Sequence, residues 1–308
     1  MTPIRVALAG LVLVASQPAL ALNIVFDYSH DTSGFFTGHA DRIALLDAAA
    51  QVFDTRLQDQ LTAIVSSGGN HFNAQFIDPT AGASVTVNDF SVVANQLTVF
   101  VGARNLGAGT LGEGGPGGYT ISATSQGFVD NAVSRGQAGA LASTPTDFGP
   151  WGGALTFNNT GITWYFDSNV GTTESFSGYD FYSVAVHELG HMLGFGSAPS
   201  FSNKVVGSNF TGINSQSLYG GPVPMADSAH WAGSVTSTVN GVTQQVAMSP
   251  SLSNGQRKQF TALDFAALQD LGWQVAPVPE ADTWAMMLVG IGLVGYRLRR
   301  KQGLRQYA

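Results

Sequence analysis

The chain has 308 residues, of which 44% are hydrophobic and 11% are charged, and it contains 38 glycines. This composition is typical of one folded domain with many turns, and it excludes a disordered chain. The formal net charge of -7 argues against nucleic acid as a partner, and the absence of cysteine excludes disulfides and thiolate metal ligands. A transition-metal site in this chain must therefore use His, Asp or Glu.

The first 21 residues have the order of an export signal. Arg5 precedes an apolar run over residues 6–15, and Ala19-Leu20-Ala21 fits the small-x-small rule for cleavage. We therefore predict a signal peptide over residues 1–21 that is cut before Leu22. The alternative interpretation is a buried N-terminal strand.

The region after the signal peptide alternates between helical and strand-like patterns. Apolar residues recur every three or four positions between Asp41 and Ile64, which predicts a helix over that range. The glycine-rich segment 107–118 is interpreted as a loop, and the pattern from Thr261 to Leu271 predicts a C-terminal helix. Four β-rich runs bounded by turn residues predict strands at 84–87, 97–103, 154–157 and 163–166.

Residues 187–191 form an H-E-x-x-H motif with His187, Glu188 and His191. In a helix, positions i and i+4 share one face, so both imidazoles can reach one Zn²⁺ ion while Glu188 lies beside them. Asp180 is placed to cap the start of this helix. A zinc site normally has a third protein ligand and an open position for water.

The third ligand is found by elimination among the residues after His191. The only histidine there is His230, and the only glutamate is Glu280, which lies in the C-terminal tail. We therefore favour His230 as the third ligand. Asp227 is the rival, because a carboxylate oxygen also binds zinc, and in the alternative it orients an imidazole instead.

The stretch 187–197, HELGHMLGFGS, resembles the signature of the metzincin metalloproteases, in which a third histidine would stand at the position of Ser197. A serine hydroxyl is a poor zinc ligand, so the pattern departs here, although leishmanolysin-like metzincins also delay their third histidine by an insertion. The resemblance covers about residues 22–273. It implies an α+β, zincin-like fold, with a twisted mixed β-sheet, a long N-terminal helix, the active-site helix and a C-terminal helix. Met248 would then form the Met-turn beneath the zinc.

The resemblance implies a zinc-dependent endopeptidase that acts on a protein or peptide substrate. Zn²⁺ would polarise the scissile carbonyl and activate a water molecule, with Glu188 as the general base. The substrate would lie along an edge strand, which we expect at residues 154–157. The alternatives are a noncatalytic surface or biofilm-matrix protein with a structural zinc site, and a zinc hydrolase of non-protein amides. Calcium stays open as a second cation, but no EF-hand or nonapeptide repeat supports it.

The C-terminal region combines Val278-Pro279-Glu280-Ala281, an apolar run over residues 284–296 and a basic cluster at 297–301. A helix over the apolar run is about 20 Å long, short for a bilayer core of about 30 Å. This order resembles the PEP-CTERM sorting signal of Gram-negative bacteria, although Ala281 replaces the last proline of its usual Pro-Glu-Pro motif. The resemblance implies a transient membrane anchor, processing by an exosortase-type enzyme, and release to the cell surface or medium. A permanent anchor is the alternative.

These patterns together predict four parts of the chain. A signal peptide occupies residues 1–21, and a metalloprotease domain occupies residues 22–276. A sorting segment follows at 277–301, and a basic tail occupies 302–308.

Overall fold

The structure is a computed structural model that describes residues 22–171, 174–277 and 290. The chain divides into two units, residues 1–275 and 276–308. The predicted signal peptide lies outside the described residues, and so does the predicted sorting segment, apart from residues 277 and 290. Within the described ranges, no helix has both the length and the apolar character needed to cross a membrane.

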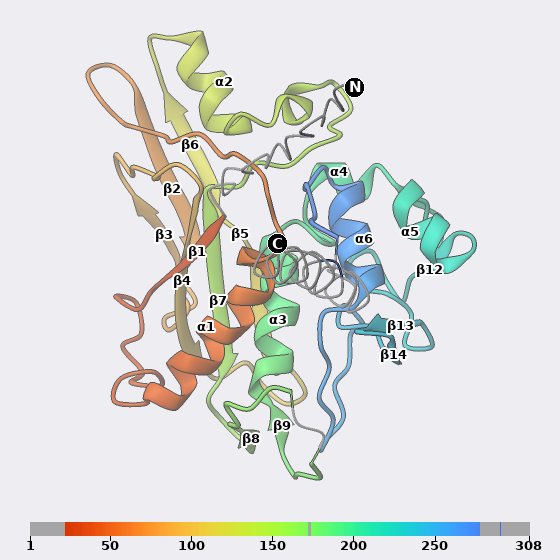
Figure 1. The fold of residues 1–308 in the computed structure, drawn as a ribbon. Coiled ribbons are helices and arrows are strands. Elements are labelled where there is room, and N and C mark those ends of the chain that lie inside the picture. Colours follow the sequence, from red (N-terminus) through yellow and green to blue (C-terminus); the bar gives the residue numbers. More distant parts are fainter. Residues whose placement is uncertain (1–21, 172–173, 278–289, 291–308) are drawn as a thin grey trace, which may run out of the picture. The chain divides into compact units, whose positions relative to one another are not determined.

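A four-stranded sheet with the order β1-β4-β7-β5 organises the first unit (Figure 1). The strands β1 (Asn23–Asp27), β4 (Gln96–Arg104) and β7 (Gly152–Asn158) are parallel to one another. The strand β5 (Gly112–Pro116) runs antiparallel to β7 and forms one edge of the sheet. The central strands β4 and β7 are buried over most of their length, as expected for parallel strands that are covered on both faces.

Two helices cover one face of this sheet. The helices α1 (Ala40–Asp54) and α3 (Phe181–Met192) pack against each other, and α3 also contacts β5 and β7 (Figure 1). Leu97, Val99 and Val101 alternate along β4 and belong to the main hydrophobic core with the buried residues of both helices. Side chains alternate between the two faces of a strand, so these three residues define the face of the sheet that α3 covers. We call α3 the motif helix, because it carries the H-E-x-x-H motif.

A second sheet covers the opposite face and has the order β3-β2-β6. Its strands are antiparallel: β2 (His71–Ile77), β3 (Ser84–Val87) and β6 (Gly118–Ser122). Phe72 and Phe76 of β2 join Phe100 of β4 and Trp151 in a second core. The rings of Phe76 and Phe100 stack with their centroids 4.1 Å apart.

The remaining elements are short and most of them follow the motif helix. The first of them are α2 (Gln126–Ser134), the 3₁₀ helix η1 (Ala138–Leu141), β8 (Trp164–Tyr165) and β9 (Tyr179–Asp180). After α3 come α4 (Pro199–Ser202), β10 (Val205–Val206), β11 (Asn209–Phe210), α5 (Ile213–Tyr219), β12 (Val223–Pro224), β13 (Thr236–Val239), β14 (Val242–Gln245) and α6 (Ala262–Asp270).

The α+β class predicted from sequence is confirmed, and all four predicted strands are present with shifts of at most two residues at an end. The predicted helix from 41 to 64 is wrong in its second half, because α1 ends at Asp54. Leu57 and Ile64 lie beyond it in isolated β-bridges, with Val275 and Val92. Both side chains are buried. Their spacing therefore matches the apolar repeat of a helix, although the backbone there is not helical.

The glycine-rich segment 107–118 contains β5 and is not entirely a loop as predicted. The prediction that residues 154–157 form an edge strand is also wrong. Residues 154–157 belong to β7, which pairs with β4 on one side and with β5 on the other. The edge next to the motif helix is therefore β5.

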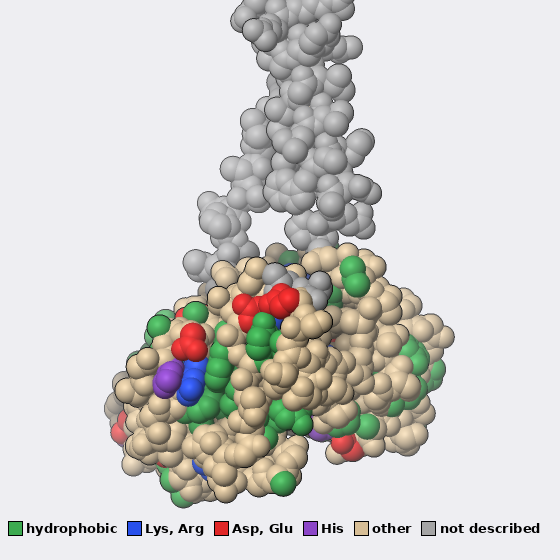
Figure 2. All heavy atoms as spheres, turned by 90° about the horizontal axis from the view of Figure 1, so that it is seen from below, with side chains coloured by type: hydrophobic (Ala, Val, Ile, Leu, Met, Phe, Trp, Pro, Cys, Tyr) green, Lys and Arg blue, Asp and Glu red, His purple; other side chains and the backbone are tan. Residues whose placement is uncertain are grey.

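Figure 2 shows one face of the molecule, on which charged side chains form only a few small groups among uncharged atoms. This distribution agrees with the low charged fraction of 11%. The polar surface of this face depends mainly on backbone and on uncharged polar side chains.

Candidate metal centre

The helix that carries the motif is fixed at its N-terminus by a buried carboxylate. Asp180 caps α3 by accepting a hydrogen bond from the Ser183 N–H at 3.0 Å, which confirms the predicted cap. The guanidinium of Arg257 donates to the same carboxylate at 2.8 and 3.1 Å. Asp180 is fully buried, so this pair joins the start of α3 firmly to the segment before α6.

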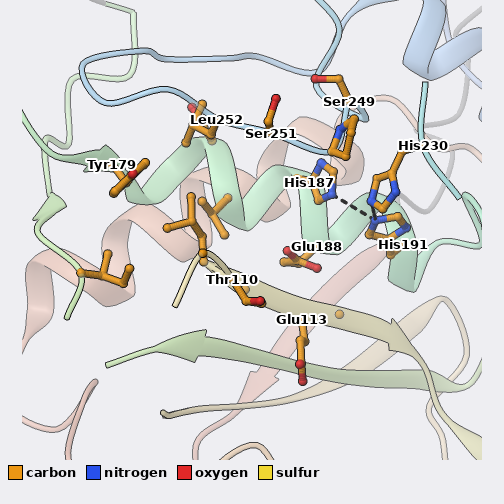
Figure 3. A pocket seen from close by; sticks show the side chains of 18 of the residues that line it. Thr110, Glu113, Tyr179, His187, Glu188, His191, His230, Ser249, Ser251 and Leu252 are labelled. Carbon is orange, nitrogen blue, oxygen red and sulfur yellow. Dashed lines mark hydrogen bonds between the residues drawn. The ribbon is translucent and has the colours of Figure 1, made fainter. Parts of the chain in front are cut away.

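Three histidines converge at the other end of α3. One ring nitrogen from each of His187, His191 and His230 lies within 4.8 Å of the other two. The Nε2 atom of His191 lies 3.0 Å from Nε2 of His187 and 3.2 Å from Nε2 of His230 (Figure 3). His187 and His191 come from successive turns of α3, whereas His230 comes from a separate loop.

The other ring nitrogen of each imidazole, Nδ1, faces an oxygen atom that can only accept a hydrogen bond. Nδ1 of His187 donates to the Ala247 carbonyl oxygen at 2.8 Å, and Nδ1 of His191 donates to the Phe195 carbonyl oxygen at 2.8 Å. Nδ1 of His230 donates to the Asp227 carboxylate at 2.9 Å. In its neutral form each imidazole therefore carries its proton on Nδ1, and the three Nε2 atoms then present lone pairs to one another.

Three converging lone pairs without a proton between them repel one another unless a cation lies among them. Tetrahedral Zn²⁺ with Zn–N bonds of about 2.0–2.1 Å places its nitrogen ligands about 3.3 Å apart. The Nε2 separations of 3.0 and 3.2 Å are close to this value. The donor set therefore fits a single ion of this kind.

The electrostatic surroundings favour the neutral forms of His187 and His191. Burial lowers the pKa of His187 well below its ordinary value, and the neighbouring His191 lowers it further. Burial also lowers the pKa of His191 to about 4, although the hydrogen bond to Phe195 opposes this shift. Neutral imidazole is the form that binds a metal ion.

His230 reaches the site on a tight hairpin. Met225 and Trp231 form an antiparallel bridge, and the Ala226 N–H donates to the His230 carbonyl oxygen at 2.9 Å. The loop approaches the end of α3 at Gly196, where φ is +73° and an added Cβ would lie 2.6 Å from Cα of Ala229. Gly196 is therefore required both for its backbone conformation and for the approach of the His230 loop.

Asp227, the rival third ligand, lies next to His230 and orients its ring. Burial raises the pKa of Asp227, but hydrogen bonds from Ala229 and His230 reverse this effect and leave it below its ordinary value. The Ser197 hydroxyl donates to the His191 carbonyl oxygen at 2.7 Å. Ser197 is thus engaged in the turn after α3.

Met248 lies under the motif helix. Its side chain is fully buried, and a Cβ added at Gly190 would lie 2.5 Å from its sulfur. Gly190 within the H-E-x-x-H motif therefore allows the methionine to pack directly against α3. The preceding residue, Ala247, supplies the carbonyl oxygen that accepts from His187.

Asp264 connects these separate segments, and no motif in the sequence predicts a role for it at the site. Its buried carboxylate accepts hydrogen bonds from the backbone N–H groups of Ala247 at 2.9 Å and Met248 at 3.3 Å. It also accepts from Nε1 of Trp231, the residue after His230, at 3.0 Å. With Thr261 it forms the capping box of α6, and this local pattern was the available sequence signal.

Glu188 is buried between α3 and β5 (Figure 3). Burial raises its pKa to about 8, the charge of Glu113 adds to the rise, and the Gly114 N–H opposes it. An added Cβ would lie 2.9 Å from Oε1 of Glu188 at Gly112, and 2.7 Å from its backbone oxygen at Gly114. The alternate glycines of β5 are therefore the reason that this strand can lie directly against the motif helix.

The three histidines and Glu188 line a cavity of about 1070 Å³. One wall is formed by residues 105–114, which include most of β5. Another wall is formed by residues 247 and 249–252, whose side chains include Ser249 and Leu252 in Figure 3. The cavity has the size of an ordinary ligand-binding cleft.

Comparison with known proteins identifies one motif. Residues 277–301 match the model of the PEP-CTERM protein-sorting motif. This match supports the predicted sorting signal, and it implies export, processing by an exosortase-type enzyme, and a surface or extracellular location in a Gram-negative bacterium. No curated protein matches the chain.

Proposed function

We propose that the protein is an exported zinc-dependent endopeptidase with a metzincin-like catalytic domain. The observation that carries the proposal is the convergence of three Nε2 lone pairs beside a buried glutamate in an open cavity. His187, His191 and His230 would hold the ion. A Zn²⁺ ion held there would supply Lewis-acid polarisation of a carbonyl group and would lower the pKa of a water molecule.

Glu188 is the proposed general base. Its carboxylate lies on the cavity wall one residue after His187. Positive charge bound at the histidines favours its ionised form, which accepts a proton at Oε1 or Oε2 and returns it to the departing amine nitrogen. Asp227 and the carbonyl groups of Ala247 and Phe195 hold the imidazoles in the tautomer that the metal requires.

The edge strand β5 provides the proposed binding surface for an extended peptide. It is the terminal strand of its sheet, and its residues Gly112, Glu113 and Gly114 line the cavity. Backbone groups on the outer side of such a strand can pair with a substrate chain. The substrate backbone would then lie alongside Glu188 and the histidines.

The purified protein tests this proposal directly. We expect about one zinc ion per chain, and hydrolysis of an unfolded protein such as casein that a chelator abolishes and Zn²⁺ restores. A folded protein without bound metal would contradict the metal site. A folded, zinc-containing protein that cleaves neither casein nor a peptide library would indicate the noncatalytic alternative.

A further inference from the structure

One wall of the cavity contains a buried cation that the proposed chemistry does not use. Lys258 is 3% exposed, and it is the only lysine or arginine among the lining residues that the structure describes. Its ammonium donates to the Ser249 hydroxyl at 2.6 Å and to the Ser251 carbonyl oxygen. Two of its three N–H donors are thus engaged by neutral acceptors.

No carboxylate within the described part of the chain forms an ion pair with this ammonium. Burial lowers the pKa of Lys258 to about 8, and the nearby charge of Asp264 only partly opposes this shift. A buried cation without a counter-ion is costly, and a third N–H donor remains for a ligand. The acidic residues that line the cavity are Glu113 on β5 and Glu188 on α3, and neither of them forms an ion pair with Lys258.

The backbone of Lys258 lies one helical turn from the metal site. Its N–H donates to the Ser183 hydroxyl at 2.7 Å, and Ser183 precedes His187 by four residues on the same face of α3. The ammonium also lies close to this site, because it contacts Ser249, two residues after Ala247, whose carbonyl oxygen accepts from His187. An extended peptide advances about 3.3 Å per residue, so a substrate carboxylate bound there would belong to a residue near the scissile bond.

We propose that Lys258 forms a carboxylate-binding subsite of the cavity and makes the enzyme prefer peptides with a carboxylate close to the scissile bond. This inference rests on the proposed peptidase function. The carboxylate has two sources, an Asp or Glu side chain and a free C-terminus. Both would accept the third N–H of the ammonium, and the neutral amide analogues would lose this charge-assisted bond.

Matched fluorogenic peptides test the subsite. Each pair differs only by Glu or Gln at one of the three positions on either side of the scissile bond, and a further set ends in a free acid or an amide. We expect the zinc-loaded enzyme to favour the carboxylate by roughly 10- to 100-fold in kcat/KM at one position. Lys258→Met and Lys258→Gln should both bring this ratio close to one, and Gln keeps a side chain that can still hydrogen-bond to Ser251.

Lys204→Met is the control variant, because Lys204 is also partly buried and donates to the Ser200 carbonyl oxygen, but it does not line the cavity. It should retain the full preference. An unchanged ratio in the folded Lys258 variants, or no preference at any position in the wild-type enzyme, overturns the proposal. If no peptide is cleaved, the peptidase function fails instead. Fluorescence anisotropy of the same pairs on the zinc-loaded protein then still tests Lys258.

Discussion

Nδ1 of His230 donates to the carboxylate of Asp227 at 2.9 Å, and the two residues lie on the same tight hairpin. The carboxylate also accepts from the Ala229 N–H at 2.8 Å, so its position is fixed by the turn itself. Because Asp227 holds the proton on Nδ1, Nε2 of His230 is free to face the other two histidines. His230, the favoured ligand, therefore faces the metal site with Nε2, whereas Asp227, the rival, lies on the Nδ1 side of the same ring.

This relationship predicts unequal effects of two substitutions on zinc affinity. His230→Ala removes one of three proposed ligands and should largely abolish stoichiometric zinc binding. Asp227→Ala leaves all three imidazoles and should weaken zinc binding or activity by roughly 10- to 100-fold. Competition with a chromogenic chelator measures both affinities, with circular dichroism as a check of folding. Wild-type affinity in His230→Ala together with zinc loss in Asp227→Ala would identify Asp227 as the ligand.

Glu188→Gln should separate binding from turnover. The substitution keeps the size of the side chain and the three histidines, but the amide does not accept a proton as the carboxylate does. We expect bound zinc and the thermal transition to be retained, while kcat falls by at least about 100-fold. Metal analysis and peptide hydrolysis on the same preparation check this outcome. Unchanged kcat would mean that a different group is the base.

Two neighbouring glycines of β5 provide a matched pair. A Cβ at Gly114 would lie 2.7 Å from the backbone oxygen of Glu188, whereas a Cβ at Gly115 would meet nothing within 4 Å. Gly114→Ala should therefore push the edge strand away from α3, lower the melting temperature and reduce kcat/KM. Gly115→Ala should change neither quantity appreciably. Equal behaviour of the two variants would contradict the close packing of β5 on the motif helix.

Asp264 and Asp270 lie on the same helix and allow a second comparison. Both are buried and accept several hydrogen bonds, but Asp270 binds Asn214 and Ser215, whereas Asp264 binds the segments next to His187 and His230. Replacing either by Ala should cost about 3 kcal/mol or more of unfolding free energy, because buried donors lose their acceptor. Only Asp264→Ala should also weaken zinc binding. Chemical denaturation and chelator competition distinguish the two effects.

The proposed carboxylate preference should depend on pH. The pKa of Lys258 is lowered to about 8, so its ammonium is charged at pH 7 and loses its proton as the pH rises through 8. The Glu-to-Gln ratio in kcat/KM should therefore fall between pH 7 and pH 9. Asp264 and His187 are the other titratable groups with which Lys258 interacts, and both affect the two peptides equally. A constant ratio over this range would contradict a role for the ammonium.

Local spacing was sufficient to predict part of the candidate site. The helical repeat places His187 and His191 on one face regardless of what surrounds the helix, and a carboxylate before an apolar run, Asp180, is a local capping signal. The same local rules failed after Asp54, where buried side chains continued the helical spacing in an extended segment. They also failed in the glycine-rich segment that contains β5, because glycine has little strand propensity and its role here is close packing.

The available chemistry can be read from the amino-acid sequence: His187, Glu188 and His191 in one helical motif, no thiolate ligand, and one further histidine downstream. The way in which distant residues meet depends on the three-dimensional fold. The approach of His230 depends on the hairpin and on Gly196, and the links through Asp264 join segments far apart in the chain. The burial of Lys258 in the cavity wall could not be predicted from the sequence either. Such contacts arise from packing between elements, and no short sequence pattern encodes the distance between two segments that are separated by a long loop.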